Sequence, residues 1–300
     1  MPVDVVTIDA NTPLLNAKLT ERRRGSNFMR RLVSRPTATA GAIIILIFIL
    51  VALLAPVLAP HDPTEINTKL RRTGPTTANL MGADELGRDI LSRVIYGARV
   101  SLLVGLISIG IALSVGTLLG VVAGYFGGGV DALIMRVTDV MMAFPGILLA
   151  ITVVAILGPG LFNVMIAVGI EAIPAYTRTA RASTLTIREQ EYVIGARSIG
   201  ANHRRLLFRY ICPNIVSPLI VLATIGVAGS ILAAAGLSYL GLGAQPPTAE
   251  WGAMLAGGRK YVREAWWMST FPGIAIMLVV LALNLLGDGL RDILDPRLRK

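Results

Sequence analysis

Long uncharged stretches, separated by short charged ones, dominate the pattern of this chain. The first lies between Arg35 and His61, where residues 40–58 are nearly all Ala, Ile, Leu, Val or Phe. A helix needs ~20 apolar residues to cross a bilayer, whereas the apolar core of a cleaved signal peptide has only roughly 7–15. The stretch therefore predicts a first, uncleaved transmembrane helix at residues 39–59.

Further stretches of the same character follow. Three glycines at 127–129 end the next one, and Gly158-Pro159-Gly160 divides a later one into a hairpin of two short helices. The Pro-rich residues 240–249 predict a loop. The five additional spans are expected at residues 101–126, twice within 140–170, at 215–239 and at 270–287.

The apolar runs are continuous rather than alternating. Only helices and closed barrels satisfy every backbone polar group in lipid, and barrel strands alternate apolar and polar positions. The pattern therefore predicts an all-α integral membrane protein with six transmembrane helices and both termini on one side. With the termini inside, 19 Lys and Arg lie in cytoplasmic segments and nine in outer segments, so the positive-inside rule predicts cytoplasmic termini.

These spans divide the chain into parts. Besides the first helix, we expect a cytoplasmic N-terminal tail at 1–38, an extracytoplasmic loop at 60–97, a core domain with five helices at 98–289, and a cytoplasmic C-terminal tail at 290–300. The core includes a cytoplasmic segment at 177–213.

Composition supports a membrane protein. Hydrophobic residues make up 54% of the chain and charged residues 15%, against roughly 25% charged in soluble domains. The net charge of +10 alone would also fit nucleic acid, but its distribution follows the predicted topology, so we expect the lipid bilayer and no nucleic acid as a partner. One cysteine, Cys212, and two distant histidines argue against a disulfide or a multi-cysteine metal site.

The segment at 177–213 is more regular than a simple connection. Thr186 and Glu189 match a capping box, which predicts a short helix running to about Ser198. Gly200 supplies a turn, and a second, Arg-rich helix is expected from Asn202 until Pro213 ends it. On composition alone, an amphipathic hairpin lying on anionic lipid headgroups explains this pattern equally well.

The spacing within this segment carries a resemblance. Gly195-Ala196, then Gly200, then Tyr210-Ile211-Cys212-Pro213 resembles the EAA loop of bacterial ABC-importer permeases. The sequence departs from that motif at four positions, Ile194, Gly195, Tyr210 and Cys212, but keeps the glycine turn and the proline.

Other segments resemble the same family in the same order. Together they cover the chain from about residue 27 to its end and are similar to the C-type permease subunit of dipeptide and oligopeptide importers, inner-membrane components of binding-protein-dependent transport systems. The matching segments are residues 82–93, 97–102, 124–128, 236–247 and 287–292.

The resemblance implies a type I permease fold with cytoplasmic coupling helices, located in the bacterial cytoplasmic membrane. It also implies a homologous second permease subunit, two cytoplasmic ABC ATPase subunits that use ATP and Mg, and an extracytoplasmic peptide-binding protein. In this family the EAA loop docks on an ATPase, which implies the same role for residues 177–213 here. The residues of this chain that the resemblance places in the ATPase-coupling loop are Glu191, Gly195, Ala196, Arg197, Gly200, Ala201, Asn202 and Pro213.

The chain itself has no sequence signature of an enzyme. No phosphate-binding loop, nucleophile elbow, zinc helix or dinucleotide fingerprint occurs, and none of the four lysines follows a glycine. We therefore expect a non-catalytic subunit that binds no cofactor or metal of its own.

Glu171 is the one acidic residue inside a predicted span. Ionisable residues in membranes are costly and often functional, so one hypothesis places Glu171 on the transport pathway, meeting a substrate ammonium. The alternative is a helix-packing role near the inner mouth.

The aromatic residues of the outer turn, Trp251, Tyr261, Trp266 and Trp267, predict a membrane-interface belt, or else part of a surface that receives the binding protein.

The function implied is import of di- or oligopeptides through half of a translocation pathway. Relatives of this permease type import glutathione, nickel chelates or oligosaccharides, so the sequence leaves the substrate open. Two other classes remain for comparison: an ion-coupled secondary transporter, which needs ionisable residues along its spans, and a membrane-anchored scaffold.

Overall fold

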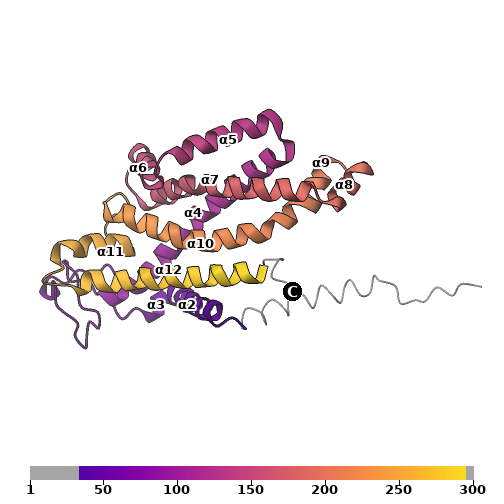
Figure 1. Cartoon of the computed structure of the whole chain (residues 1–300). Helices are drawn as coiled ribbons and strands as arrows, with labels where there is room; N and C mark the ends of the chain where they lie inside the picture. The colour runs from indigo at the N-terminus through magenta and orange to yellow at the C-terminus, as the bar shows by residue number, and fades with distance from the viewer. Residues whose placement is uncertain (1–33, 295–300) are drawn as a thin grey trace, which may run out of the picture.

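The structure, a computed structural model, describes residues 34–294 (Figure 1). Apart from one β-bridge between Ala83 and Asp89, these residues form helices, turns and loops. The predicted all-α class is therefore confirmed. Most of the two predicted tails, at 1–33 and 295–300, lies outside the described residues.

The helices follow one another with short connections. In chain order they are α2 (Pro36–Leu53), α3 (Ala55–Leu58), η1 (Thr68–Leu70), α4 (Ile90–Phe126), α5 (Gly128–Ala143), α6 (Gly146–Leu157), α7 (Leu161–Arg188), α8 (Glu191–Ser198), α9 (His203–Arg205), the π-helical turn η2 (Leu206–Ile211), α10 (Cys212–Tyr239), α11 (Trp251–Gly258), η3 (Arg259–Tyr261) and α12 (Trp267–Leu294).

Four helical stretches among the described residues are long and apolar enough to cross a membrane: α2, α4, the run from α9 through α10, and α12. The pair α5 and α6, bent by 95°, adds a fifth if it counts as one broken span. The sixth predicted span corresponds to α7, which has 28 residues and carries polar side chains toward its end.

The predicted hairpin at 140–170 is correct at its turn but wrong in its first helix. An additional break occurs at Phe144-Pro145, between α5 and α6. Phe144 has extended backbone angles, as expected for a residue before proline, whose ring disfavours the helical conformation there. The result is a 12-residue α6, shorter than a bilayer crossing requires.

The contact between α4 and α7 organises the bundle. Gly116, Gly120 and Gly124 lie one turn apart on α4 and let α7 approach its backbone. A Cβ on Gly120 would overlap the carbonyl oxygen of Thr177 and lie 2.7 Å from the Cβ of Ala180. These two helices are packed too closely for any larger side chain.

The two ends of the bundle differ in structure (Figure 1). α8 and α9 lie at one end, whereas α11 and the loop after α3 lie at the other. The start of α2 and the end of α12 meet, with Arg35 Nη1 3.2 Å from Asp292 Oδ2. In Figure 1 both described chain ends point toward the α8 and α9 end.

The expectation of an aromatic belt in the outer turn is wrong for two of its tryptophans. Trp251 is fully buried, with its Nε1 donating to the carbonyl of Val94 at 3.0 Å, and Trp267 is 8% exposed. Only Trp266, at 50% exposed, has the accessible ring that a membrane-interface residue needs. The buried pair instead forms part of the core.

Candidate functional site

The segment from α8 to α9 forms a helix, a glycine turn and a second short helix, as predicted. Gly200 has a φ of +86°, which favours glycine. Its N–H donates to Arg197 O at 3.0 Å, and the N–H of Ala201 donates to Ala196 O at 3.1 Å. These are the two hydrogen bonds of a Schellman motif, so α8 ends in a well-defined turn.

Asn202 begins the second helix. Its Oδ1 accepts a hydrogen bond from the N–H of Arg205 at 2.8 Å, which satisfies one of the free donors of the first turn. The prediction of a helix start at this position is therefore confirmed.

The predicted end of this helix at Pro213 is wrong. The chain passes through the π-helical turn η2 directly into α10, and Pro213 lies in the first turn of α10. Proline has no N–H to donate and its ring crowds the carbonyl of an earlier turn, and a π turn accommodates such an irregularity within a longer helix. The segment from α8 to α9 therefore continues through η2 into α10, and the run from α9 through α10 is long and apolar enough to cross a membrane.

The predicted capping box is also wrong. α7 continues to Arg188, so Thr186 lies inside a helix and its hydroxyl donates to Ala182 O at 3.1 Å. α8 begins after Gln190, which makes no side-chain cap, and Glu189 pairs instead with Arg188 at 2.9 Å.

The predicted coupling residues divide between the two faces of the segment. Ala196 is buried, and Ala201 is half-buried against the core. Glu191, Gly195, Arg197, Gly200 and Asn202 are exposed, and so is Pro213. Six of the eight predicted coupling residues are therefore accessible to solvent or to a partner.

Large apolar side chains are exposed on this same segment. Ile199 is 87% exposed, Phe208 74% and Ile194 46%. Exposed apolar groups of this size mark a surface that contacts either another protein or a membrane.

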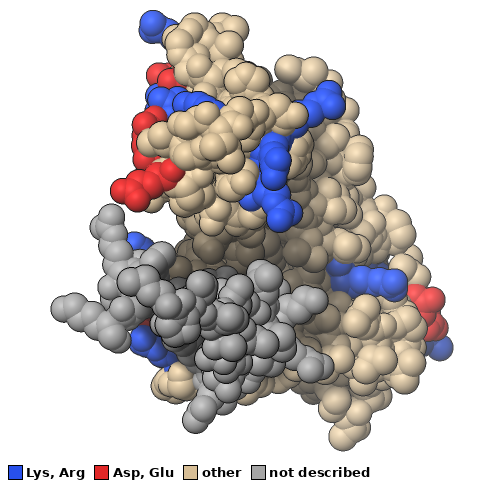
Figure 2. Space-filling view, turned by 90° about the vertical axis from the view of Figure 1, so that its right-hand side faces the viewer, with Lys and Arg blue, Asp and Glu red and all other residues tan. Residues whose placement is uncertain are grey.

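Basic residues surround these apolar groups. Figure 2 looks onto this end of the molecule, where Lys and Arg side chains project around a hollow in the face. Among the described residues, no carboxylate lies within ion-pair distance of Arg197, Arg204, Arg205 or Arg209. An open groove along η2 is lined by Arg205, Phe208, Arg209, Tyr210 and Pro213.

Three contacts that the sequence did not reveal hold this end of the bundle together. Arg181 and Asp131 form a two-pronged ion pair between α7 and α5, with Nη2 2.6 Å from Oδ2. Arg188 Nη1 donates to Gly124 O at 2.9 Å, and the hydroxyl of Tyr125 lies 2.7 Å from Nδ1 of His203. All three join residues at least 50 positions apart, so no local pattern predicts them.

Glu171 lies elsewhere, at the break between α5 and α6. Its carboxylate contacts Gly146, where a Cβ would overlap it. The side chain is half-buried and is not paired with Arg178, which instead contacts Asp139 at 2.6 Å.

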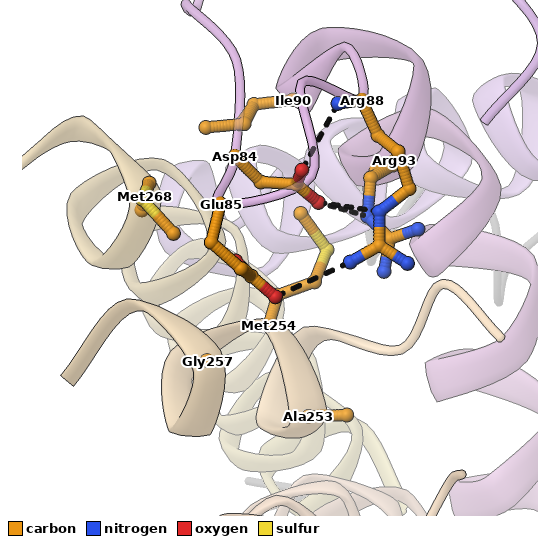
Figure 3. A pocket seen from close by; sticks show the side chains of 9 residues that line it. All are labelled: Asp84, Glu85, Arg88, Ile90, Arg93, Ala253, Met254, Gly257 and Met268. Carbon is orange, nitrogen blue, oxygen red and sulfur yellow. Dashed lines mark hydrogen bonds and ion pairs between the residues drawn. The ribbon is translucent and has the colours of Figure 1, made fainter. Parts of the chain in front are cut away.

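A buried charged cluster stabilises the opposite end (Figure 3). Arg88 Nε lies 2.6 Å from Asp84 Oδ2, and Arg88 Nη2 lies 3.4 Å from Glu85 Oε1. Arg93 Nε lies 3.6 Å from Asp84 Oδ2, and Arg93 Nη1 donates to Pro63 O at 2.9 Å. A small cavity separates these side chains from Met254 and Gly257 of α11. The cluster ties the start of α4 to the loop between α3 and α4.

The start of α4 therefore lies earlier than predicted. Asp89 caps the helix by accepting a hydrogen bond from the N–H of Ser92 at 2.8 Å, and the helix runs 37 residues to Phe126. In the same loop the exposed Asp62 accepts hydrogen bonds from the hydroxyl and the N–H of Thr64, which lower the pKa of that carboxyl.

The long apolar helices and the exposed segment of two short helices joined by a glycine turn define a helical membrane protein of the transport-permease class. A family model described as binding-protein-dependent transport system inner membrane component matches residues 116–300, and one described as the N-terminal TM domain of oligopeptide transport permease C matches residues 24–75. The chain belongs to this family of inner-membrane transport components. Members are transmembrane permease subunits, which supports the expectation that the chain is not an enzyme.

Relatives cover nearly the whole chain. The chain is 46% identical to the di/tripeptide transport system permease protein DppC of Pseudomonas aeruginosa, over 96% of this chain and 97% of that protein. It is 44% identical to the dipeptide transport system permease protein DppC of Alkalihalophilus pseudofirmus (98% and 97% covered). It is also 46% identical to the glutathione transport system permease protein GsiD of Pectobacterium atrosepticum (97% and 96% covered).

A solved structure has the same fold. A chain of the MetNI methionine ABC transporter in an inward-facing conformation matches with a TM-score of 0.55 and 19% identity, over 68% of this chain and 97% of that chain. At this identity the likeness concerns the fold alone.

Proposed function

We propose that this chain forms half of the translocation pathway of an ATP-driven importer of di- or oligopeptides. A homologous permease subunit forms the other half, two cytoplasmic ATPase subunits hydrolyse ATP with Mg, and an extracytoplasmic peptide-binding protein delivers the substrate. The single observation that carries this proposal is the exposed segment from α8 to α9, which is built to receive another protein.

Gly195 supports a docking role most directly. Its backbone has no positive φ, and a Cβ built on it meets no atom within 4 Å. The chain's own packing therefore gives no reason for glycine here, and a helix interior loses about 1 kcal/mol with glycine in place of alanine. A partner that approaches the α8 backbone closely supplies the reason.

The buried face of α8 supports the same role. Val193 is fully buried and Ala196 is 6% exposed, so one side of α8 packs on the bundle while the other stays free. A force applied to the free side is therefore passed to the helices beneath it. Such rigid-body displacement of packed helices is a common means of switching between two states.

The charges of this end favour an acidic partner surface rather than anionic lipid. The four arginines Arg197, Arg204, Arg205 and Arg209 attract either, but an amphipathic lipid-bound hairpin requires its apolar groups in one plane with the membrane surface. Ile199, exposed by 87%, projects from the turn at the end of α8, directly before Gly200. A protein cleft accommodates such a projecting tip.

The topology follows from this assignment. With α8 and α9 in the cytoplasm, both described chain ends also lie toward the cytoplasm, and the charged cluster of Asp84 and Arg88 lies on the outer side. The membrane is then the bacterial cytoplasmic membrane, crossed six times with α7 as the sixth span. The order of the parts is the predicted one, but three boundaries shift: the first helix begins at Pro36, the outer loop ends at Asp89, and the last helix continues to Leu294.

Peptide is the substrate best supported by the relatives, two of which are named as dipeptide or di/tripeptide permeases. Glutathione, itself a tripeptide-like molecule, is the main alternative because relatives of similar identity carry that name. Nickel chelates and oligosaccharides are weaker alternatives, since they rest on the family resemblance alone.

Transport by the reconstituted complex tests the proposal. The chain is inserted into vesicles with its permease partner, both ATPases and the binding protein loaded with a labelled dipeptide. We expect uptake of the dipeptide that requires ATP on the side of the vesicle membrane where the ATPases are bound. A complex with Gly195→Leu is expected to lose this ATP-dependent uptake. Uptake driven by an ion gradient without the ATPases would overturn the proposal in favour of a secondary transporter, and glutathione competing better than dipeptides would reassign the substrate.

A further inference from the structure

One side-chain contact joins the coupling segment to the longest helix of the molecule. Tyr125 is the penultimate residue of α4, and His203 is the first residue of α9. The hydroxyl of Tyr125 lies 2.7 Å from Nδ1 of His203. Their rings meet edge to face, with centroids 5.7 Å apart. The contact links two segments separated by 78 positions in sequence.

The position of Tyr125 gives this hydrogen bond more weight than a surface contact would have. Tyr125 is only 7% exposed, and its hydroxyl has no other hydrogen-bond partner among the described residues. The bond itself is partly buried, because His203 is exposed, so water replaces it only in part when either partner is removed. The ring of Phe126 packs edge to face on Tyr125, with centroids 5.1 Å apart.

A second contact holds the neighbouring turn. Arg188, the last residue of α7, donates from Nη1 to the carbonyl oxygen of Gly124 at 2.9 Å. The end of α4 is therefore held from two sides: by α7 through Arg188, and by α9 through His203.

α4 is the helix through which a displacement at this end would reach the other side. Its 37 residues span roughly 55 Å at 1.5 Å per residue, more than the ~40–45 Å of a whole bilayer with its headgroups. Its first turn follows Asp89 and the buried cluster of Asp84, Arg88 and Arg93. One continuous helix thus joins the coupling segment to the outer loop.

We propose that the hydrogen bond between Tyr125 and His203 is a mechanical link, which passes displacement of α8 and α9 directly to α4. Tyr125 and His203 are then positioning residues for coupling, acting through the helices that they join. The proposal rests on the proposed function, because it assumes that an ATPase moves the coupling segment.

The test measures ATP hydrolysed per peptide imported by the complete complex in vesicles. Tyr125→Phe and His203→Phe each keep an aromatic ring and remove the hydrogen bond. The matched control is Tyr96→Phe, the same substitution near the other end of α4, where the hydroxyl makes no hydrogen bond among the described residues. The double variant completes a mutant cycle.

Each single variant is expected to raise the ATP consumed per peptide about fivefold, the effect of one hydrogen bond of ordinary net strength on an equilibrium. The double variant is expected to match the single variants, because the same bond is lost only once. Tyr96→Phe is expected to behave as the wild type. A wild-type ratio in Tyr125→Phe, or single effects that simply add, would overturn the link.

A structural readout keeps this test independent of ATPase activity. Spin labels at Gly129 and Ser198, both exposed, report the distance between α8 and the start of α5, which follows the end of α4 after one residue, in the complete complex. Tyr125→Phe is expected to broaden that distance distribution, and an unchanged distribution would overturn the link even if transport changes. Absence of ATP-driven import by the wild-type complex would instead overturn the proposed function, and this outcome is recognised without any variant.

Discussion

The side chain of Glu171 lies directly against Gly146, the first residue of α6. A Cβ at position 146 would overlap the Glu171 carboxylate, so the carboxylate and the glycine fit together at the 95° bend between α5 and α6. This contact gives Glu171 a packing role at the bend. The packing role and the substrate-binding hypothesis for Glu171 can therefore be separated by comparing variants of Glu171 and of Gly146.

We predict that Glu171→Gln retains wild-type uptake kinetics, because glutamine has the same shape and the contact is one of packing. Gly146→Ala is predicted to lower the uptake rate severalfold, since the added methyl displaces the side chain of Glu171 and changes the bend. Uptake of a labelled dipeptide over a range of concentrations measures both. A several-fold higher KM in Glu171→Gln with an unchanged kcat would contradict the packing role and place the carboxylate on the pathway.

The buried cluster at the outer end is predicted to be a major source of stability. Asp84→Asn removes the negative charge that faces Arg88 and Arg93, leaving the buried guanidinium of Arg93 without a carboxylate and that of Arg88 with Glu85 alone, at 3.4 Å. Breaking a buried ion pair in this way costs about 3–5 kcal/mol. The melting temperature of the purified protein in detergent is expected to fall by several degrees.

Asp62→Asn is the matched control for that variant. Asp62 lies in the same loop, is exposed and contacts only Thr64 and its neighbours, so we expect its melting temperature to remain within error of the wild type. An equal fall in melting temperature in the two variants would show that this loop tolerates no change of charge. That result would contradict a particular contribution of the buried cluster to stability.

The close contact of α4 with α7 predicts a sharp difference between two glycines of the same helix. Gly120→Ala forces the helices apart, since its methyl would meet Ala180 and the carbonyl of Thr177; overpacking of this kind costs about 1–3 kcal/mol. Gly110→Ala meets no atom within 4 Å and is expected to be neutral or stabilising by the helix propensity of alanine. Thermal unfolding of both variants gives the comparison, and equal stability would contradict the packing.

Hydrophobic pattern alone located most of the membrane helices, because a run such as residues 215–239 is long, uncharged and bounded by polar residues. It failed at helix ends. α4 begins at Ile90, eleven residues before its predicted start, because Ser92 and Arg93 are buried against the loop after α3, where Ser92 accepts from the N–H of His61 and Arg93 donates to Pro63 O. Such pairing depends on residues far away in the sequence.

The candidate site shows the same division. The turn at Gly200 and the cap at Asn202 were predictable, since each depends on a few neighbouring residues. The capping box at Thr186 failed because α7 continues to Arg188, where Arg188 gains a long-range partner in the Gly124 carbonyl. The break at Phe144-Pro145 did have a local signal, a proline followed by a glycine at 146, which the length of the apolar run concealed.

The proposal that α8 docks on an ATPase is tested most directly by Gly195→Leu. The leucine side chain has free space within this chain, so folding and membrane insertion are expected to be unchanged, as they are for the control Gly110→Leu. The measurement is the amount of ATPase retained when the complex is purified through a tag on this chain. We predict at least a tenfold loss for Gly195→Leu and full retention for Gly110→Leu; wild-type retention of the ATPases by Gly195→Leu would contradict the docking assignment.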